Sequence, residues 1–266
     1  MKHLLLTTIA AVVLVGCGEL QQSAFPPEVE PAEPVAVATK PEPTTAKALY
    51  KIEDWQGLLG HWKFEGNVSD SSGNDNDGVA IGVPGFGEGK VGKALKLNGL
   101  SQRVELPKLA SGIDQLTIAI WIKVDHMPSS EKFVSIYHNN GWTVGDVHLG
   151  YAGQEGVLDL GINGNMPSMS VPTFRVKDLQ KRWVHLATTY NGDNKKEVRF
   201  YLDGQPGEVF KLEEANPVNL GPARIGAWDV EPRWFDGQID ELYIYERVLT
   251  DEKIRVLFEV GTKKPR

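Results

Sequence analysis

The sequence predicts an all-β domain, a sandwich or jelly roll built from many short strands, followed by one short helix. Apolar residues alternate with polar ones in many short runs, and turn dipeptides such as Asn98-Gly99 and Asp203-Gly204 separate the runs. No long stretch has the 3.6-residue period of a helix. The 28 glycines and 7 tryptophans are typical of a turn-rich β protein. Together these features favour two packed layers of strands.

The strands follow one another from the first apolar run of the domain to its end. They are expected at residues 58–64, 94–97, 103–106, 116–122, 132–137, 147–151, 157–162, 183–190, 197–202 and 239–245. The run 116–122 is almost continuously apolar, as expected for a strand covered on both faces. Thr250 is a good N-cap, so the helix is predicted from Asp251 to about Val260, with Gly261 ending it.

The closing strand carries one unusual residue, the carboxylate Asp240, among apolar neighbours. Burying a carboxylate without a partner is costly, so Asp240 must find one in the fold. Its partner is therefore a central question for the structure.

Composition narrows the functional classes. The chain has 266 residues and a formal net charge of -7, and it has no basic stripe, which argues against nucleic acid as a partner. With a single cysteine, Cys17, no disulfide can form within the chain.

The N-terminus has the features of a targeting segment. Residues 1–16 have a lysine near the start and then an apolar run too short to cross a bilayer comfortably, which is typical of a signal peptide. Leu14-Val15-Gly16-Cys17 resembles a bacterial lipobox, which implies that the Cys17 thiol carries a lipid and that the acyl chains anchor the protein in the membrane. Gly18 after the cysteine implies, by the same resemblance, the outer membrane. The alternative is an ordinary signal peptide with a chance cysteine.

The remaining chain divides by composition. Residues 17–49 are rich in proline with no apolar period, so they are predicted to form a disordered tether. The strand signals run over residues 50–262, the predicted domain, and residues 263–266 form a tail.

Seven segments in order resemble the bacterial LamG-like jelly-roll family, within the concanavalin A-like lectin/glucanase fold. They are residues 60–64, 70–78, 89–99, 116–122, 183–190, 200–204 and 237–245. The resemblance covers about Trp55 to Leu257 and implies a two-sheet antiparallel jelly-roll sandwich. It does not identify a ligand.

The resemblance also implies a structural calcium site where the two ends of the domain meet. The loop 70–78 is rich in the oxygen ligands that calcium prefers. We therefore expect Asp70 and Asp240 to supply carboxylates, with Asn76 and loop carbonyls completing the shell. The alternative is a solvated Asx-turn loop, with Asp240 bonded to backbone amides.

An enzymatic role is not expected. Glycan hydrolases of this fold need two carboxylates on one face, whereas the adjacent Asp240 and Glu241 should point to opposite faces of a strand. No serine-hydrolase, zinc-protease or phosphate-loop motif is present. His61 and His185 are interpreted as packing residues, and His138 and His148 receive no role.

The candidate ligand-binding residues lie in two loops. Trp142 follows a strand, while Trp228, Arg233 and Trp234 lie just before the closing strand. Exposed aromatic rings offer flat apolar faces to sugar rings, and arginine can bond hydroxyls. The alternative is that these tryptophans fold back over the core edge. Trp62, Trp121 and Trp183 are expected in the core.

These observations favour a lipid-anchored, non-catalytic LamG-like module of the bacterial cell envelope that binds carbohydrate or an envelope partner. A structural protein–protein interaction domain without a glycan site is the alternative, and a glycan hydrolase is a third possibility.

Overall fold

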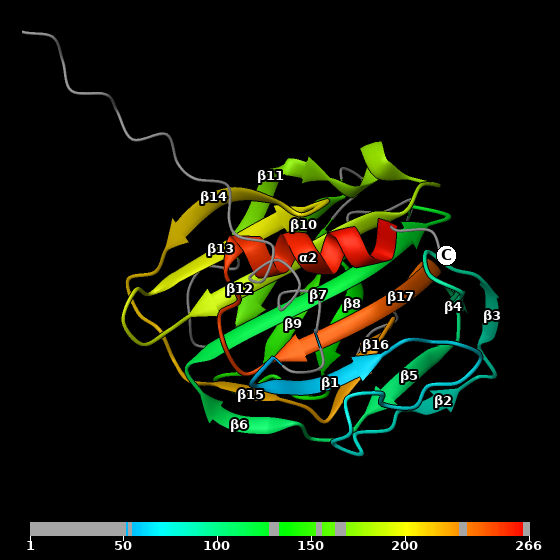
Figure 1. Ribbon diagram of the computed structural model, residues 1–266, viewed down its shortest axis with the longest axis horizontal. Coiled ribbons are helices and arrows are strands. Elements are labelled where there is room, and N and C mark those ends of the chain that lie inside the picture. Colours follow the sequence, from blue (N-terminus) through cyan, green and yellow to red (C-terminus); the bar gives the residue numbers. More distant parts are fainter. Residues whose placement is uncertain are drawn as a thin grey trace, which may run out of the picture. The chain divides into compact units, whose positions relative to one another are not determined.

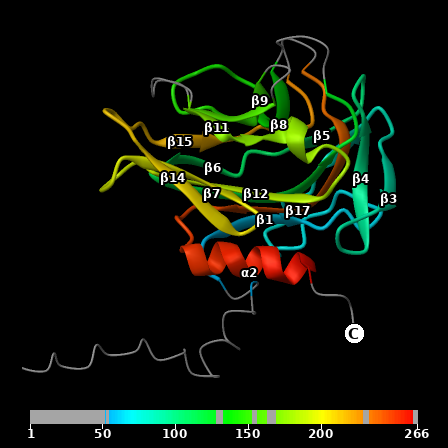
Figure 2. The same ribbon diagram turned by 90° about the horizontal axis from the view of Figure 1, so that it is seen from above.

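The computed structural model is an antiparallel β sandwich with one helix packed on its outside, as the sequence predicts (Figures 1 and 2). It describes residues 52, 55–127, 133–152, 156–162, 169–228 and 233–262. All of them belong to one compact unit, Pro41–Arg266. The predicted signal peptide, Cys17, the tether and the tail lie outside the described residues.

The first sheet has the strand order β14-β13-β12-β7-β17-β4-β3, with β1 paired to the second half of β17. Its strands are β1 (Leu58–Trp62), β3 (Gly85–Glu88), β4 (Lys93–Asn98), β7 (Gln115–Val124), β12 (Val184–Asn191), β13 (Glu197–Leu202), β14 (Gln205–Lys211) and β17 (Asp236–Tyr245). Figure 1 shows β17, the closing strand, lying between β7 and β1, so the two ends of the domain sequence are neighbours.

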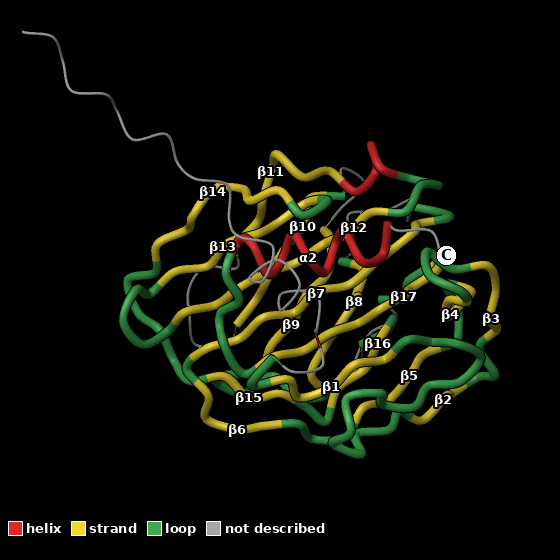
Figure 3. The backbone as a smooth tube through the Cα atoms, viewed as in Figure 1, coloured by secondary structure: helices red, strands yellow, loops and turns green. Residues whose placement is uncertain are grey.

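The second sheet has the order β11-β10-β9-β8-β16-β5-β2. Its strands are β2 (Val79–Ile81), β5 (Arg103–Leu106), β8 (Val134–Asn139), β9 (Val147–Ala152), β10 (Val157–Ile162), β11 (Met169–Arg175) and β16 (Ala223–Ile225). A small sheet pairs β6 (Ala110–Ile113) with β15 (Val218–Leu220), and a short 3-10 helix, η2 (Val176–Leu179), follows β11. Figure 3 shows how strongly strands dominate the described chain.

The core lies between the two sheets and is filled by alternate residues of their strands. Ile118, Ile120 and Ile122 of β7 point into it, as do Leu158 and Leu160 of β10. The longest apolar runs are therefore the central strands.

The strands that the sequence analysis missed are β2, β3, β6, β11, β14, β15 and β16. Several span only three or four residues, too few to establish a period of two. The edge strand β14 contains Pro206 and Gly207, residues that weaken a strand signal.

The helix α2 (Asp251–Thr262) covers the outer face of the first sheet, on the side away from the second sheet (Figure 2). Its Ile254 and Leu257 pack with Tyr243 and Tyr245 in a second apolar cluster. Gly261 does not end the helix as predicted. It lies inside the last turn, where a Cβ atom would come within 2.4 Å of the Trp121 indole nitrogen.

Among the described residues, no helix is both long enough and apolar enough to cross a membrane.

The closing strand contains a β-bulge between Asp240 and Tyr243, and this corrects the prediction that Asp240 and Glu241 face opposite sides. Ile239 and Leu242 both point into the core between the sheets. The two residues between them therefore share the outer face, since a bulge places two residues opposite one. Glu241 accommodates the bulge with a φ of 48°, in the left-handed region.

Candidate functional site

An aromatic and histidine cluster lies on the outer face of the second sheet. In β9, Val147, Leu149 and Tyr151 point into the core, so His148 points outward. His138 of β8 is the cross-strand neighbour of His148 and shares that face.

The two histidines are in direct contact. Their Nδ1 atoms are 2.7 Å apart, and the Nδ1 of His138 also lies 2.9 Å from the Asn139 carbonyl oxygen. Burial lowers the pKa of His138 to about 3, with further contributions from His148 and Arg233, so the ring is neutral at ordinary pH. Because the carbonyl only accepts, the proton of the neutral ring is on Nδ1, and His138 Nε2 is left as an acceptor.

Three of the predicted ligand-binding residues meet over this pair. The Trp142 ring is stacked on His148 with ring centroids 4.5 Å apart, and it lies 5.5 Å from Trp228. The Arg233 guanidinium lies 4.2 Å from the centre of the Trp228 ring. Trp228 in turn lies 4.9 Å from the His138 ring. The two loops thus form one cluster, which we call the Trp142 site: His138, Trp142, His148, Trp228 and Arg233.

The loop after β8 is built to present Trp142. Asp146 accepts hydrogen bonds from the backbone and hydroxyl of Thr143 and from the Asn139 side chain. The Asn139 amide also donates to the Asn219 carbonyl, which ties the loop to β15. These bonds fix the backbone on both sides of Trp142, while its side chain remains 61 % exposed.

Nε2 of His138, an acceptor, and the indole Nε1 of Trp228, a donor, are buried polar atoms of the Trp142 site that have no hydrogen-bond partner among the described residues. Unpaired buried polar atoms are uncommon in folded proteins and are costly. A group that both donates and accepts, such as a hydroxyl, could satisfy both.

Trp234, the fourth predicted residue, is half-buried, and no ring contact joins it to the cluster in the described structure. His138 and His148, which the sequence analysis left without a role, form the base of that cluster. For His148 the available signal was its alternation with core residues of β9. His138 had no such signal, because a bulge between Ser135 and Tyr137 interrupts the alternation in β8, and only the pairing of β8 with β9 shows that the two histidines meet. Trp62 and Trp121 are buried as expected, whereas Trp183 is partly exposed.

The predicted calcium ligands do not form one set in this structure. Asp70 accepts hydrogen bonds from the backbone amides of His61, Ser72 and Asn76, and from the Ser72 hydroxyl. These hydrogen bonds lower the pKa of Asp70 despite its partial burial, which acts in the opposite direction. Asp70 and Asn76 thus share a loop closed by its own hydrogen bonds.

Asp240 has different partners. Its Oδ2 accepts hydrogen bonds from the backbone amides of Lys90 and Val91, 2.8 and 2.9 Å away, and no group in the described chain bonds to both Asp70 and Asp240. No cluster of three metal-binding His, Cys, Asp or Glu side chains occurs among the described residues. The structure therefore provides no shared ligand set, and calcium remains a prediction for solution measurement.

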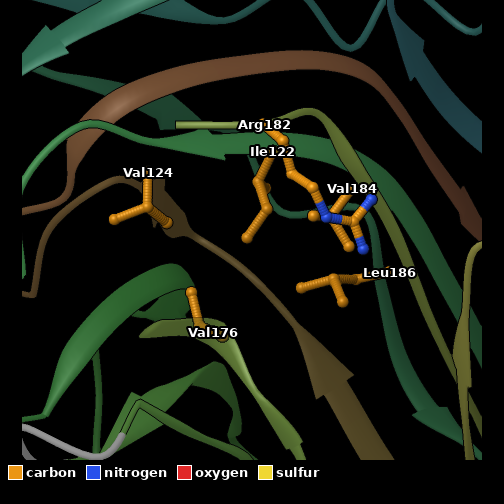
Figure 4. A pocket seen from close by; sticks show the side chains of 6 residues that line it. All are labelled: Ile122, Val124, Val176, Arg182, Val184 and Leu186. Carbon is orange, nitrogen blue, oxygen red and sulfur yellow. The ribbon is translucent and has the colours of Figure 1, made fainter. Parts of the chain in front are cut away.

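The small apolar pocket in Figure 4 is not a ligand site. Its cavity of about 10 Å³ has room for one water molecule at most. The lining side chains come from β7, η2, β12 and the turn before β12: Ile122, Val124, Val176, Arg182, Val184 and Leu186. It is a packing defect at the edge of the core.

The fold defines a lectin-type jelly roll, and the family comparison agrees. The sequence profile of the concanavalin A-like lectin/glucanases superfamily (Laminin_G_3) matches residues 98–255, more than half of the chain. The chain belongs to this family. No curated protein matches it.

Solved structures share the fold at low sequence identity. Domain 4 of AbnA, a GH43 extracellular arabinanase from Geobacillus stearothermophilus solved in complex with arabinotriose, is 22% identical with a TM-score of 0.60, over 75% of this chain and 97% of that one. The binding domain of Paraclostridial Mosquitocidal Protein 1 is 16% identical with a TM-score of 0.62, over 77% of this chain and 52% of that one.

Botulinum neurotoxin type C, whose cell entry is dependent upon interaction with two ganglioside molecules, is 15% identical with a TM-score of 0.62, over 79% of this chain and 52% of that one. This chain thus spans about half the length of the two toxin structures. At these identities the similarity shows the fold alone.

Proposed function

We propose that the protein is a non-catalytic carbohydrate-binding module and that the Trp142 site holds the sugar. The observation that carries the proposal is an exposed indole next to a buried acceptor and a buried donor that both lack partners among the described residues. A sugar ring offers an apolar face for stacking on Trp142 and hydroxyls that both donate and accept. The solved relatives named above include one in complex with arabinotriose, which supports the class of ligand.

In this proposal a sugar ring stacks on Trp142, and one hydroxyl bridges His138 Nε2 and Trp228 Nε1. Both atoms are buried, so the proposal requires neighbouring side chains to move when the hydroxyl enters. Arg233 rests on Trp228 and holds that ring in place.

A glycan array followed by calorimetry on the full-length protein tests the proposal. Trp142→Ala should weaken binding of the best glycan at least about tenfold, which corresponds to about 1.4 kcal/mol. Leu100→Ala is the matched control, because Leu100 is also exposed but contributes nothing to the Trp142 site. Equal affinities of Trp142→Ala and the parent protein, or no glycan bound at all, would refute the assignment.

We also propose that Cys17 is acylated and holds the protein on the bacterial envelope, with the outer membrane as the expected location. The lipobox-like sequence at residues 14–17 supports this. Labelled palmitate should enter the parent protein and not Cys17→Ser. Equal labelling of both would refute the anchor.

A further inference from the structure

A second site lies on the other sheet of the sandwich. A groove of about 650 Å³ lies beside the paired strands β1 and β17 and the C-terminal end of α2. It is lined by Ile52, Leu58, His61, Lys63, Glu65, Ser71, Val91, Glu241, Tyr243 and Val260. This volume is in the range of small-molecule sites.

Three polar side chains at the groove form a hydrogen-bonded unit. Glu241 Oε2 accepts a hydrogen bond from His61 Nε2 at 2.7 Å and one from the Tyr243 hydroxyl at 2.9 Å. The His61 and Tyr243 rings are stacked with centroids 3.8 Å apart. His61 and Glu241 are each only 8 % exposed, so packing fixes their positions.

The β-bulge directs Glu241 into this unit. The left-handed φ of 48° is unfavourable for a residue with a Cβ atom, and such conformations persist only where the surrounding structure holds them. In a regular strand Glu241 would face the opposite side from Asp240. The strained backbone therefore places the carboxylate on the groove.

Two polar atoms of this unit remain without a hydrogen-bond partner among the described residues. His61 Nε2 bonds to Glu241, and no hydrogen bond in the described structure reaches His61 Nδ1. Glu241 Oε1 likewise has no partner among the described residues. Glu241 therefore keeps lone pairs that can accept hydrogen bonds from a ligand.

Glu241 forms no ion pair with a lysine or arginine of the described chain. Asp240 shares the outer face with Glu241 and is fully buried, and its Oδ1 has no hydrogen-bond partner among the described residues. Apart from His61, no basic side chain of the described chain pairs with either carboxylate. The Lys90 ammonium lies over the Trp121 ring instead, 4.5 Å from its centre. The exposed Lys63 also lines the groove but forms no ion pair with Glu241 in the described structure.

We propose that this groove binds a ligand with a primary ammonium or guanidinium group, which forms an ion pair with Glu241. Such a group supplies only donors and a positive charge, and the Glu241 carboxylate supplies an acceptor oxygen and a negative charge. The Tyr243 ring beside Glu241 adds a favourable surface for a cation. The site is separate from the Trp142 site and does not depend on carbohydrate binding.

NMR titration of the full-length protein tests the site, with the His61 ring signals as readout. The probes are Nα-acetyl-lysine-N-methylamide, Nα-acetyl-arginine-N-methylamide and putrescine, with Nα-acetyl-norleucine-N-methylamide as the uncharged control. We expect saturable shifts with the cationic probes and none with the norleucine derivative. Preference for the two amino-acid derivatives identifies a protein side chain as the source, and preference for putrescine a free amine.

Variants locate the ion pair. Glu241→Gln should weaken cation binding at least about tenfold while keeping the His61 contact. Glu246→Gln, an exposed carboxylate outside the groove, is the matched control and should leave binding unchanged. If Glu241→Gln does not fold, Val91→Lys places an ammonium in the groove wall and should abolish binding. Absence of binding by the parent protein, or unchanged binding in the variant that folds, overturns the proposal.

Discussion

Replacing Asp240 by asparagine should remove a pH dependence of stability that this buried carboxyl group imposes on the fold. Burial raises the pKa of Asp240 from 3.8 to about 7, and Glu241 adds to the rise, while the backbone amides of Lys90 and Val91 oppose it. The asparagine side chain keeps an oxygen for the two amides and resembles the protonated acid, so the Asp240→Asn variant should fold.

The sign follows from the proton balance between the folded and unfolded states. Between pH 3.8 and about 7 the folded protein retains a proton that the unfolded chain has lost, so the free energy of unfolding falls as the pH rises. The contribution of protonated Asp240 to the free energy of unfolding is fully present below pH 3.8 and is lost above about pH 7. At 1.36 kcal/mol for each pH unit, the loss is about 4 kcal/mol for the parent protein, and Asp240→Asn should avoid it.

Urea unfolding of the parent protein and Asp240→Asn from about pH 4 to about pH 8 measures this directly. The difference between the two free energies should grow with pH in favour of the variant. Comparing the two proteins isolates Asp240, because the neutral buried His138 and His185 impose a pH dependence of the opposite sign on both. Asp114→Asn, at an exposed carboxylate, is the control. Parallel curves for the parent protein and Asp240→Asn would show that Asp240 does not cause the pH dependence.

Three further predictions concern glycine packing, a buried histidine and calcium. Gly226→Ala should lower the free energy of unfolding in urea by about 2 kcal/mol or more, because its Cβ would lie 2.2 Å from Leu97 Cδ1 and its φ is 81°. Gly73→Ala has a similar φ of 88° but open space around its Cβ, so it should cost about 1 kcal/mol. Equal costs for the two variants would contradict the steric argument. His185→Leu should stabilise the protein more at about pH 4 than at about pH 8, because burial lowers the pKa of His185 to about 3 and only the unfolded chain gains the proton; an equal change in Tm at both values would argue against it. EDTA should lower the Tm, because calcium bound at the Asp70 loop would stabilise the folded state. An unchanged Tm would contradict the calcium site and indicate that the loop is closed by its own hydrogen bonds alone.

The larger strands and the helix could be predicted because their signals are local. In β7 the apolar run, and around Thr250 the cap and acidic first turn, are visible within a few residues. The short strands β6, β15 and β16 could not be predicted, because they are defined by the strands they pair with and are too short to show an alternating pattern of their own.

The candidate sites were predicted in part. Trp142, Trp228 and Arg233 were chosen as loop residues able to contact a ligand, and the structure brings them together. The contribution of His138 and His148 depends on the register of β8 against β9, which no local pattern reveals. The relation of Asp240 to Glu241 was predicted wrongly, because a bulge is a property of strand pairing.

The amino-acid sequence was enough to predict a lectin-type sandwich, since seven short segments in order carry the periodicity and turns of that fold. It also marked Asp240 as a carboxylate in need of a partner. The partner, the backbone amides of the turn at Lys90 and Val91, is visible only in the folded domain, because this turn is far from the closing strand in the chain. Hydrogen bonds and charge pairs between distant segments depend on register and strand irregularities, which the cooperative packing of the whole domain sets.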